Sequence, residues 1–419
     1  MTSKTPLWRQ SDFLRLWSAQ TVSDFGARIT REGMPMMAVL VLAASPGQLG
    51  VLAAMSTAPA LVVGLAAGGF VDRTRRRGVL IAADLVRAAV LLTLPIAAVL
   101  GVLNIWLVYA ASALVAGASV LFDIADHAYL PGLIDRDQLT DGNARLSATE
   151  SVAEIAGPAL AGLLFQWLTA PFAVAVNAVT YAISAAFLGA IRKPEPEPNR
   201  SAPSTNWRQD VSAGFRIAWL EPRIRPLLLI SAAGALFGSF FSALYVVFAL
   251  RVLHLTPALL GFTIAAGGVG ALAGAMLAQP IARLFGVGPA IGLTLAGGAV
   301  SSLLIPLAPA NPEYGTAFLV TAQLFGDALA TASLILAASL RQSILPQAAL
   351  GRVGGAFHAA GGGMAALGAL AGGALGGAFG PREALLVAVS GLILVPLIGL
   401  FSPLRKLREM PAGDGEPGT

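Results

Sequence analysis

The sequence predicts an all-α polytopic membrane protein with twelve transmembrane helices in two halves of six. The chain of 419 residues is 56% hydrophobic and only 12% charged, with a mean hydropathy of +0.75, which excludes the soluble globular class. Twenty-two of its 27 Lys and Arg residues lie in seven short polar segments. These segments alternate with polar segments that contain almost no basic residue, as expected when basic loops stay in the cytoplasm.

Twelve apolar segments follow one another along the chain, each close to the roughly 20 residues that cross a bilayer. Short loops such as 45–48 make consecutive helices antiparallel neighbours. An even number of spans puts both termini on one side, and the basic segments place that side in the cytoplasm. We therefore expect a multi-pass protein of the bacterial cell (inner) membrane. The expected spans are 16–43, 49–71, 78–100, 104–128, 145–168, 171–191, 226–250, 258–282, 287–308, 316–340, 351–378 and 383–403.

A linker separates the two halves. Alternating prolines at 194–198 exclude a helix there, because each ring removes a backbone donor and clashes with the preceding turn. The following segment, 207–220, has the pattern of an amphipathic helix on the inner membrane surface. The expected parts are an N-terminal six-helix half at 1–191, a cytoplasmic linker with the amphipathic helix at 192–225, a C-terminal six-helix half at 226–403 and a cytoplasmic tail at 404–419.

Several functional classes are excluded by composition and motifs. The chain has no Cys, and its three His residues are scattered, so we expect no metal site. It has no phosphate-binding loop of the Gly-x-x-x-x-Gly-Lys-Ser/Thr type and no nucleophile triad, so we expect no cofactor and no enzymatic activity. Its basic residues lie in separate loops instead of one face with interleaved aromatic residues, which excludes nucleic acid as a partner.

The loop after the second span has a specific pattern. Positions 68–77 read GGFVDRTRRR. This resembles the signature of the major facilitator superfamily at the same loop, Gly-x-x-x-Asp-Arg-x-Gly-Arg-Arg, with Arg75 in place of the last Gly. Together with the six-plus-six symmetry, the resemblance covers essentially the whole chain. It implies that Asp72, Arg73 and Arg76 gate the inner ends of the helices in one access state. The acidic partners of these arginines would be Asp123 or Asp126.

Two further patterns narrow the resemblance to exporters. Gly157-Pro158 followed by Gly162 looks like the motif in span 5 of the superfamily's antiporters, where proline and glycine bend a helix and allow close packing. An ordinary helix kink is the alternative interpretation. The segments 84–87 and 340–353 are similar to the branch that contains macrolide efflux proteins and the enterobactin exporter. The resemblance implies proton antiport without a cofactor.

The first span contains four ionisable residues, each costly in lipid. Asp24, Arg28, Arg31 and Glu32 are spaced so that opposite charges fall along one stripe of a helix. In the superfamily, spans 1, 4, 7 and 10 line the central cavity, which makes Arg28 and Arg31 candidates for the substrate cavity and Asp24 and Glu32 candidates for proton coupling. A self-neutralising pair that merely orders the helix is the alternative.

Two more carboxylates lie inside other spans. Glu154 follows Glu150 by one helical turn in span 5, which favours reversible proton binding, although a bond to a neighbouring helix would equally account for it. Asp327 is the acidic residue in the apolar interior of the second half, with Gln323 one turn earlier. We expect Asp327 to line the cavity or to exchange protons, and Gln323 to line the cavity.

Span 7 contains a mixed aromatic and hydroxyl surface that includes Phe241 and Tyr245. Such a wall suits a large amphiphilic molecule, whereas lipid-facing side chains are the alternative. The sequence therefore predicts a monomeric secondary active transporter that exports drug-like or siderophore-like organic molecules by proton antiport. A nutrient or lipid transporter of the same fold is the alternative function. The expected partners are a small organic substrate, protons and the lipid bilayer.

Overall fold

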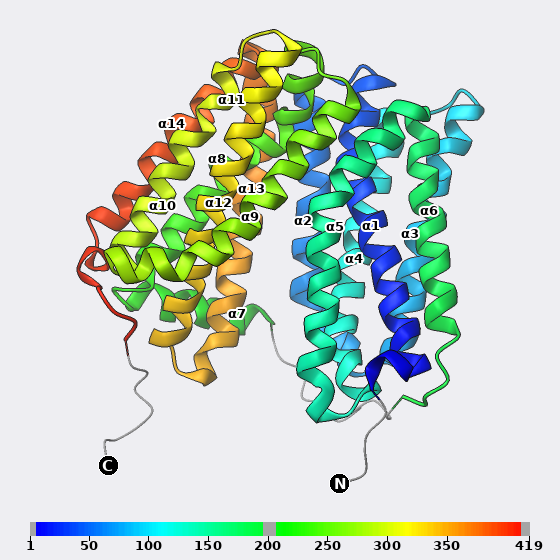
Figure 1. Ribbon diagram of the computed structural model, residues 1–419, viewed down its shortest axis with the longest axis horizontal. Coiled ribbons are helices and arrows are strands. Elements are labelled where there is room, and N and C mark those ends of the chain that lie inside the picture. Colours follow the sequence, from blue (N-terminus) through cyan, green and yellow to red (C-terminus); the bar gives the residue numbers. More distant parts are fainter. Residues whose placement is uncertain (1–5, 196–206, 412–419) are drawn as a thin grey trace. The chain divides into compact units, whose positions relative to one another are not determined.

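The computed structural model describes residues 6–195 and 207–411, except for the side chains at positions 65, 66, 68, 69 and 72. Helices make up most of this part of the chain, and it contains no strand (Figure 1). By its contacts the chain divides into two compact units, Met1–Ala43 with Met55–Thr205 and Ala44–Ala54 with Asn206–Thr419. Residues 44–54 thus group with the second unit, an assignment that the apolar pattern of the sequence does not indicate.

The first unit is built around α1, α3 and α6. α1 packs against α5 and α6, and α3 packs against α4 and α6. The helices are α1 (Ser11–Leu40), α2 (Pro46–Asp72, whose first turns belong to the second unit), α3 (Arg76–Val99), α4 (Ile105–Leu133), α5 (Leu139–Trp167) and α6 (Ala170–Gly189).

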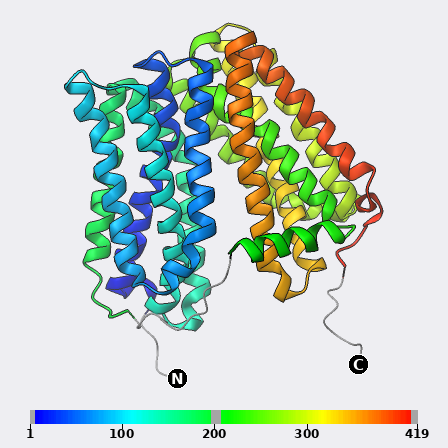
Figure 2. The ribbon, with the colours of Figure 1, turned by 180° about the vertical axis from the view of Figure 1, so that it is seen from behind.

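In the second unit α8 packs against α13 and α14, while α12 packs against α9 and α10. α7 packs mainly against α13 and lies crosswise to it in Figure 2. The helices are α7 (Trp207–Leu220), α8 (Arg225–Val247), α9 (Pro257–Phe285), α10 (Val287–Ser302), α11 (Leu304–Leu307), α12 (Pro312–Ile344), α13 (Gln347–Phe379) and α14 (Pro381–Leu400).

Each predicted span coincides with a helix, except that the span at 287–308 comprises α10 and the short α11. The predicted amphipathic segment forms α7. Ten of the described helices are long and apolar enough to cross a membrane. α1 and α5 are outside these ten, because both contain several charged residues. The all-α polytopic membrane fold is therefore confirmed, and the order of helices is consistent with twelve spans.

Local sequence signals define several helix ends. Asn104, Thr256 and Asn311 each accept a hydrogen bond from a backbone N–H in the first turn of the helix that follows, as N-capping residues do. α9 and α13 end at Gly286 and Gly380, whose φ values of 87° and 104° disfavour any side chain. These signals turn the chain sharply, so that α10 and α14 start directly after the preceding helix.

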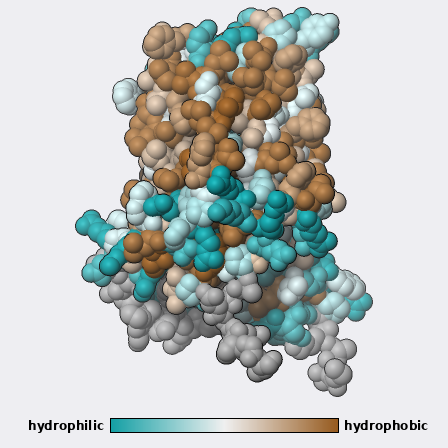
Figure 3. Space-filling model, turned by 90° about the vertical axis from the view of Figure 1, so that its left-hand side faces the viewer, coloured by the Kyte–Doolittle hydropathy of each residue, from teal (hydrophilic) through white to brown (hydrophobic). Residues whose placement is uncertain are grey.

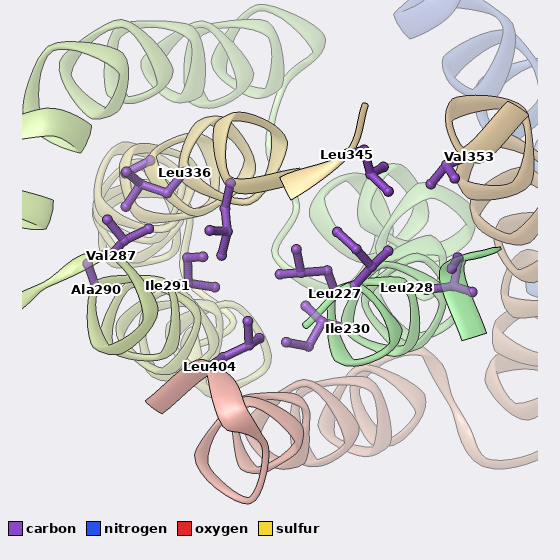
Figure 4. Packing of buried hydrophobic residues seen from close by; sticks show 14 of the residues in the cluster. Leu227, Leu228, Ile230, Val287, Ala290, Ile291, Leu336, Leu345, Val353 and Leu404 are labelled. Atoms are coloured by element: carbon purple, nitrogen blue, oxygen red, sulfur yellow. The ribbon is translucent and has the colours of Figure 1, made fainter. Parts of the chain in front are cut away.

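The second unit has an apolar core at one end of its helices. Leu227 of α8, Ile291 of α10 and Leu336 of α12 are among the buried residues that meet there, together with Val353 of α13 (Figure 4). On the face shown in Figure 3, hydrophobic side chains predominate in the upper part and hydrophilic side chains gather below them. The second unit thus has both a buried apolar core and an apolar outer surface, as expected for helices surrounded by lipid.

In the first unit, two carboxylates hold the segment that follows α6. Asp12 in the first turn of α1 accepts hydrogen bonds from the backbone N–H groups of Arg192 and Lys193 at 3.0 and 2.9 Å. Glu195 accepts hydrogen bonds from the backbone N–H groups of Arg76 and Arg77 at 2.7 and 3.2 Å. The carboxylate of Glu195 therefore satisfies two donors at the start of α3, where a negative charge is favourable.

Candidate functional site

The charged stripe of α1 forms an ion pair with α5 in the first unit. Both guanidinium Nη atoms of Arg28 donate to the carboxylate oxygens of Glu154, each at 2.9 Å. Such a bidentate pair is among the stronger charge interactions in proteins. The Arg28 side chain is 16% exposed and that of Glu154 is 46% exposed. Glu154 thus makes the bond to a neighbouring helix that was one of its two predicted roles, and it remains accessible from outside the protein.

Gly157 lets the two helices come close enough for this pair. A Cβ atom at Gly157 would lie 2.5 Å from Cβ of Arg28, a distance that real Cβ atoms do not tolerate. Pro158 is buried inside α5, and the helix continues through it to Trp167. Gly162 is also buried. The predicted Gly-Pro-x-x-x-Gly segment therefore lies at the contact between α5 and its neighbours, where small residues permit close approach.

Four carboxylates lie near one another in the first unit. Asp24 of α1 is partly exposed, one turn before Arg28, and it interacts electrostatically with Glu150, Asp126 and Asp123. These groups come from α1, α4 and α5, and α1 lies about 100 residues before the other two helices in the sequence. No set of three His, Cys, Asp or Glu residues in the described part of the chain could hold a metal ion. A group of carboxylates on three helices suits the exchange of protons, because repulsion between their charges favours proton binding.

The remaining charges of α1 differ in their surroundings. Arg31 is exposed, and its Nε lies 3.5 Å from a carboxylate oxygen of Glu32, which is 12% exposed. This contact joins adjacent residues, whereas the predicted pairing joined residues three or four positions apart along one stripe. Arg28, in contrast, bonds to α5, a partner that helical spacing within span 1 does not reveal.

In the predicted gate, the described hydrogen bonds involve Arg76 and Asp126. Arg76 Nη1 donates to the backbone carbonyl of Ala128 in α4 at 2.9 Å. Asp126 accepts a hydrogen bond from Gln20 of α1, and Asp123 is exposed. Arg73 is exposed as well, and the side chain of Asp72 lies outside the described residues. The described bonds thus hold α3 to α4 and α1 to α4.

A second ion pair lies in the interior of the first unit and was not predicted as a site. Asp84 and Arg87 of α3 form a hydrogen-bonded pair, and their side chains are 0% and 3% exposed. The Arg87 guanidinium lies 4.4 Å from the ring centre of Phe122 and 4.2 Å from that of Tyr181. It therefore joins α3 to α4 and α6 by cation–π contacts. Opposite charges three residues apart in an apolar span were the signal for this pair.

In the second unit, Asp327 and Gln323 of α12 face a glycine of α9. A Cβ atom at Gly267 would overlap the Asp327 carboxylate and would lie 3.5 Å from Nε2 of Gln323. Both side chains are partly buried. Gly270 and Gly274, further along α9, lie against the backbone of α12. The absence of side chains on this face of α9 therefore provides the space in which the predicted carboxylate lies.

If the chain transports by proton antiport, as the sequence predicts, Gly267→Ala should lower uphill transport several-fold, because the added methyl group must displace the Asp327 carboxylate. The protein should still fold, since the Asp327 side chain can rotate away from the added methyl group. The measurement is the initial transport rate per folded protein. Gly292→Ala in α10 is the matched control, because a Cβ atom there meets nothing within 4 Å. Equal rates for the two variants would show that the place of Asp327 is unimportant.

The aromatic residues of span 7 divide into packed and accessible groups. Phe240 lies against Gly372 of α13, and Tyr245 is buried, with its hydroxyl donating to Thr263 Oγ1 of α9 at 3.2 Å. Phe241 is partly exposed. Of the two predicted cavity residues, Phe241 is thus the one available to a ligand in this structure, whereas Tyr245 joins α8 to α9.

Known proteins resemble this chain in sequence. A family model described as transmembrane secretion effector matches residues 1–415. Macrolide efflux protein A of Streptococcus pyogenes is 25% identical over 268 residues, which is 63% of this chain and 65% of that protein. The match thus spans just under two thirds of that relative's length. Macrolide efflux protein A of Enterococcus faecalis is 24% identical over 219 residues, 52% of this chain and 68% of that protein.

Solved structures share the fold at low identity. The nucleoside transporter NupG superposes with a TM-score of 0.75 and 11% identity, covering 93% of this chain and 98% of that one. A bacterial homologue of the iron transporter ferroportin gives a TM-score of 0.75 at 15% identity, covering 94% and 99%. A bacterial homologue of the lysosomal transporter Spinster gives 0.72 at 13% identity, covering 96% and 98%. At such identities the likeness concerns the fold alone.

Proposed function

Because this chain belongs to the transmembrane secretion effector family of major facilitator transporters, we propose that it exports drug-like or siderophore-like organic molecules by proton antiport. The observation that supports this best is the Arg28–Glu154 pair, which joins α1 to α5 through a carboxylate that is 46% exposed. The macrolide efflux relatives support a bulky organic substrate. The chain is a transporter and not an enzyme.

The ion pair suggests how a proton can be coupled to a change of state. An ionised Glu154 binds Arg28 bidentately, and a protonated Glu154 loses the charge that holds the guanidinium. Proton entry would thus release Arg28 and loosen the contact of α1 with α5. In alternating access, such a change biases one arrangement of the two halves over the other.

The cluster of Asp24, Asp123, Asp126 and Glu150 supplies the second part of the mechanism. Asp24 interacts electrostatically with the other three carboxylates and with Arg28, so the negative charges of the cluster oppose one another. Either a cationic amphiphile or protons would relieve this repulsion. Once one of them is bound, the other has less negative charge to bind to. Competition for the same carboxylates would then exchange inward protons for outward substrate. Asp327 of α12, which lies against the glycine face of α9, is the corresponding carboxylate of the second unit.

We propose that the protein is a monomer in the bacterial inner membrane with both termini in the cytoplasm. The apolar helices and the family support a multi-pass membrane transporter. The orientation rests on the basic segments, which hold 22 of the 27 Lys and Arg residues. The same distribution accounts for the high isoelectric point without any nucleic-acid partner.

Everted membrane vesicles test the proposed function. With an acidic lumen, wild-type vesicles should accumulate a macrolide antibiotic as protons leave, and a protonophore should abolish the accumulation. Vesicles without the protein are the control. Accumulation that persists without a proton gradient would contradict antiport. If the vesicles took up nucleosides or lipids but no drug from a panel, the alternative of a nutrient or lipid transporter would be favoured.

A further inference from the structure

The helix α7 is fixed to the second unit by one face. A Cβ atom at Gly214 would overlap the backbone carbonyl of Arg352 in α13, so the two helices touch at this glycine. Ala218, one turn later, is fully buried. α7 lies crosswise to α13 and is followed after four residues by α8 (Figure 2). Its opposite face is therefore held in a fixed position at the end of the membrane-spanning helices.

The charges of α7 and the following turn leave an excess of arginine. Asp210 already pairs with Arg352 at 3.3 Å, and Glu221 pairs with Arg223 at 2.8 Å. The guanidinium groups of Arg208 and Arg225 lie over the rings of Trp207 and Trp219, 5.4 and 5.8 Å from the ring centres. Arg216 is exposed. The acidic groups of this segment are thus used in contacts that do not involve Arg208, Arg216 or Arg225.

The exposed surface beside these arginines is apolar. Trp219 and Leu220 are 54% and 69% exposed, and Phe215 is also exposed. A groove of about 560 Å³ runs along α7, lined by Ser212, Ala213, Arg216, Ile217 and Leu220. Ser212, Arg216 and Leu220 are four residues apart and share one row of the helix. A hydroxyl and a guanidinium therefore stand beside aliphatic side chains in one groove.

We propose that this groove binds an anionic phospholipid of the adjacent leaflet. Arg216 would bind the phosphate, with Ser212 as a second polar contact, and the first acyl carbons would lie along Ile217 and Leu220. Tryptophan beside arginine is typical of segments at the membrane surface, because one side chain prefers the interface and the other prefers anionic headgroups. A soluble acidic ligand would satisfy the arginines but would leave Trp219 and Leu220 in water.

The test measures lipid retention by the full-length protein in detergent, using native mass spectrometry with added phosphatidylglycerol or phosphatidylcholine. The wild type should retain phosphatidylglycerol preferentially. Arg216→Gln should weaken that binding about five-fold, the effect expected for one basic residue at an anionic surface. Arg216→Lys should keep most of it, because the positive charge remains.

Arg283→Gln is the matched control, since Arg283 is an exposed arginine in the last turn of α9 in the same unit. It should bind phosphatidylglycerol like the wild type. Unchanged thermal unfolding of each variant would show that folding is preserved. Equal retention by the wild type and Arg216→Gln would overturn the proposal and assign the arginines to another acidic partner. An equal loss in Arg283→Gln would also overturn it, because binding would then reflect total charge.

Discussion

Arg87→Leu is expected to lower the free energy of unfolding by about 3–5 kcal/mol, because it leaves a buried carboxylate without its counter-charge. Asp84 and Arg87 are both almost completely excluded from solvent, and Arg87 also contacts two aromatic rings. The double variant Asp84→Leu/Arg87→Leu should recover much of the loss, since no isolated charge remains. The measurement is thermal unfolding of the purified protein in detergent.

Two further variants separate charge from packing. Arg87→Lys keeps the charge but loses the planar group between Phe122 and Tyr181, so an intermediate loss is expected. Arg145→Leu is the matched control, because Arg145 pairs with Asp141 on an exposed surface and should matter by only about 0–1 kcal/mol. If Arg87→Leu and the double variant were equally unstable, the aromatic contacts and not the buried charge would determine stability.

Glu154→Gln is expected to reduce uphill transport to the level of vesicles without a proton gradient. Glutamine keeps the shape of Glu154 and can still form hydrogen bonds, but its amide does not take up or release a proton at physiological pH. Downhill exchange of substrate should continue, because binding does not require the titration. The measurement compares gradient-driven transport with gradient-free exchange in the same preparation of liposomes. This prediction rests on the proposed proton antiport.

The double variant Arg28→Gln/Glu154→Gln shows whether an unpaired arginine alone is responsible. It removes the unpaired charge that Glu154→Gln leaves on Arg28, so it should fold like the wild type. It should still fail to transport uphill, because no titratable carboxylate remains at position 154. Asp24→Asn and Asp327→Asn complete the series. If all three neutral single variants retained full uphill transport, these carboxylates would be structural. Glu32 would then be the next candidate, or a different driving ion.

Helix positions were largely predictable, because apolarity and helix caps are both local. The helices differ from the predicted spans where a helix extends beyond the apolar segment. α5 starts at Leu139 and not at residue 145, since its first turns are polar yet helical. α12 starts at Pro312 and not at residue 316, because the side chain of Asn311 caps it. Lipid exposure sets the apolar edge, whereas capping sets the end of the helix.

The candidate site was predictable by residue type but not by partner. Charges inside spans 1 and 5 could be recognised from their cost in lipid. The Arg28–Glu154 bond joins residues 126 positions apart and depends on α1 packing against α5. Likewise, the proximity of Asp327 to Gly267 follows from the packing of α9 on α12. Spacing within one helix contains no information about which other helix lies beside it.

The anchoring of the segment after α6 has a consequence for a protein proposed to work with protons. Burial opposes ionisation of Asp12, but hydrogen bonds from the Arg192 and Lys193 backbones and from Arg15 together lower its pKa below the ordinary value. A lowered pKa means that the stabilisation is complete above the ordinary pKa and disappears only as the pH falls through the lowered one. At cytoplasmic pH Asp12 therefore stays ionised and keeps its hydrogen bonds to Arg192 and Lys193. The hydrogen bonds that hold the segment after α6 therefore stay formed at pH values at which carboxylates in the membrane interior are proposed to exchange protons.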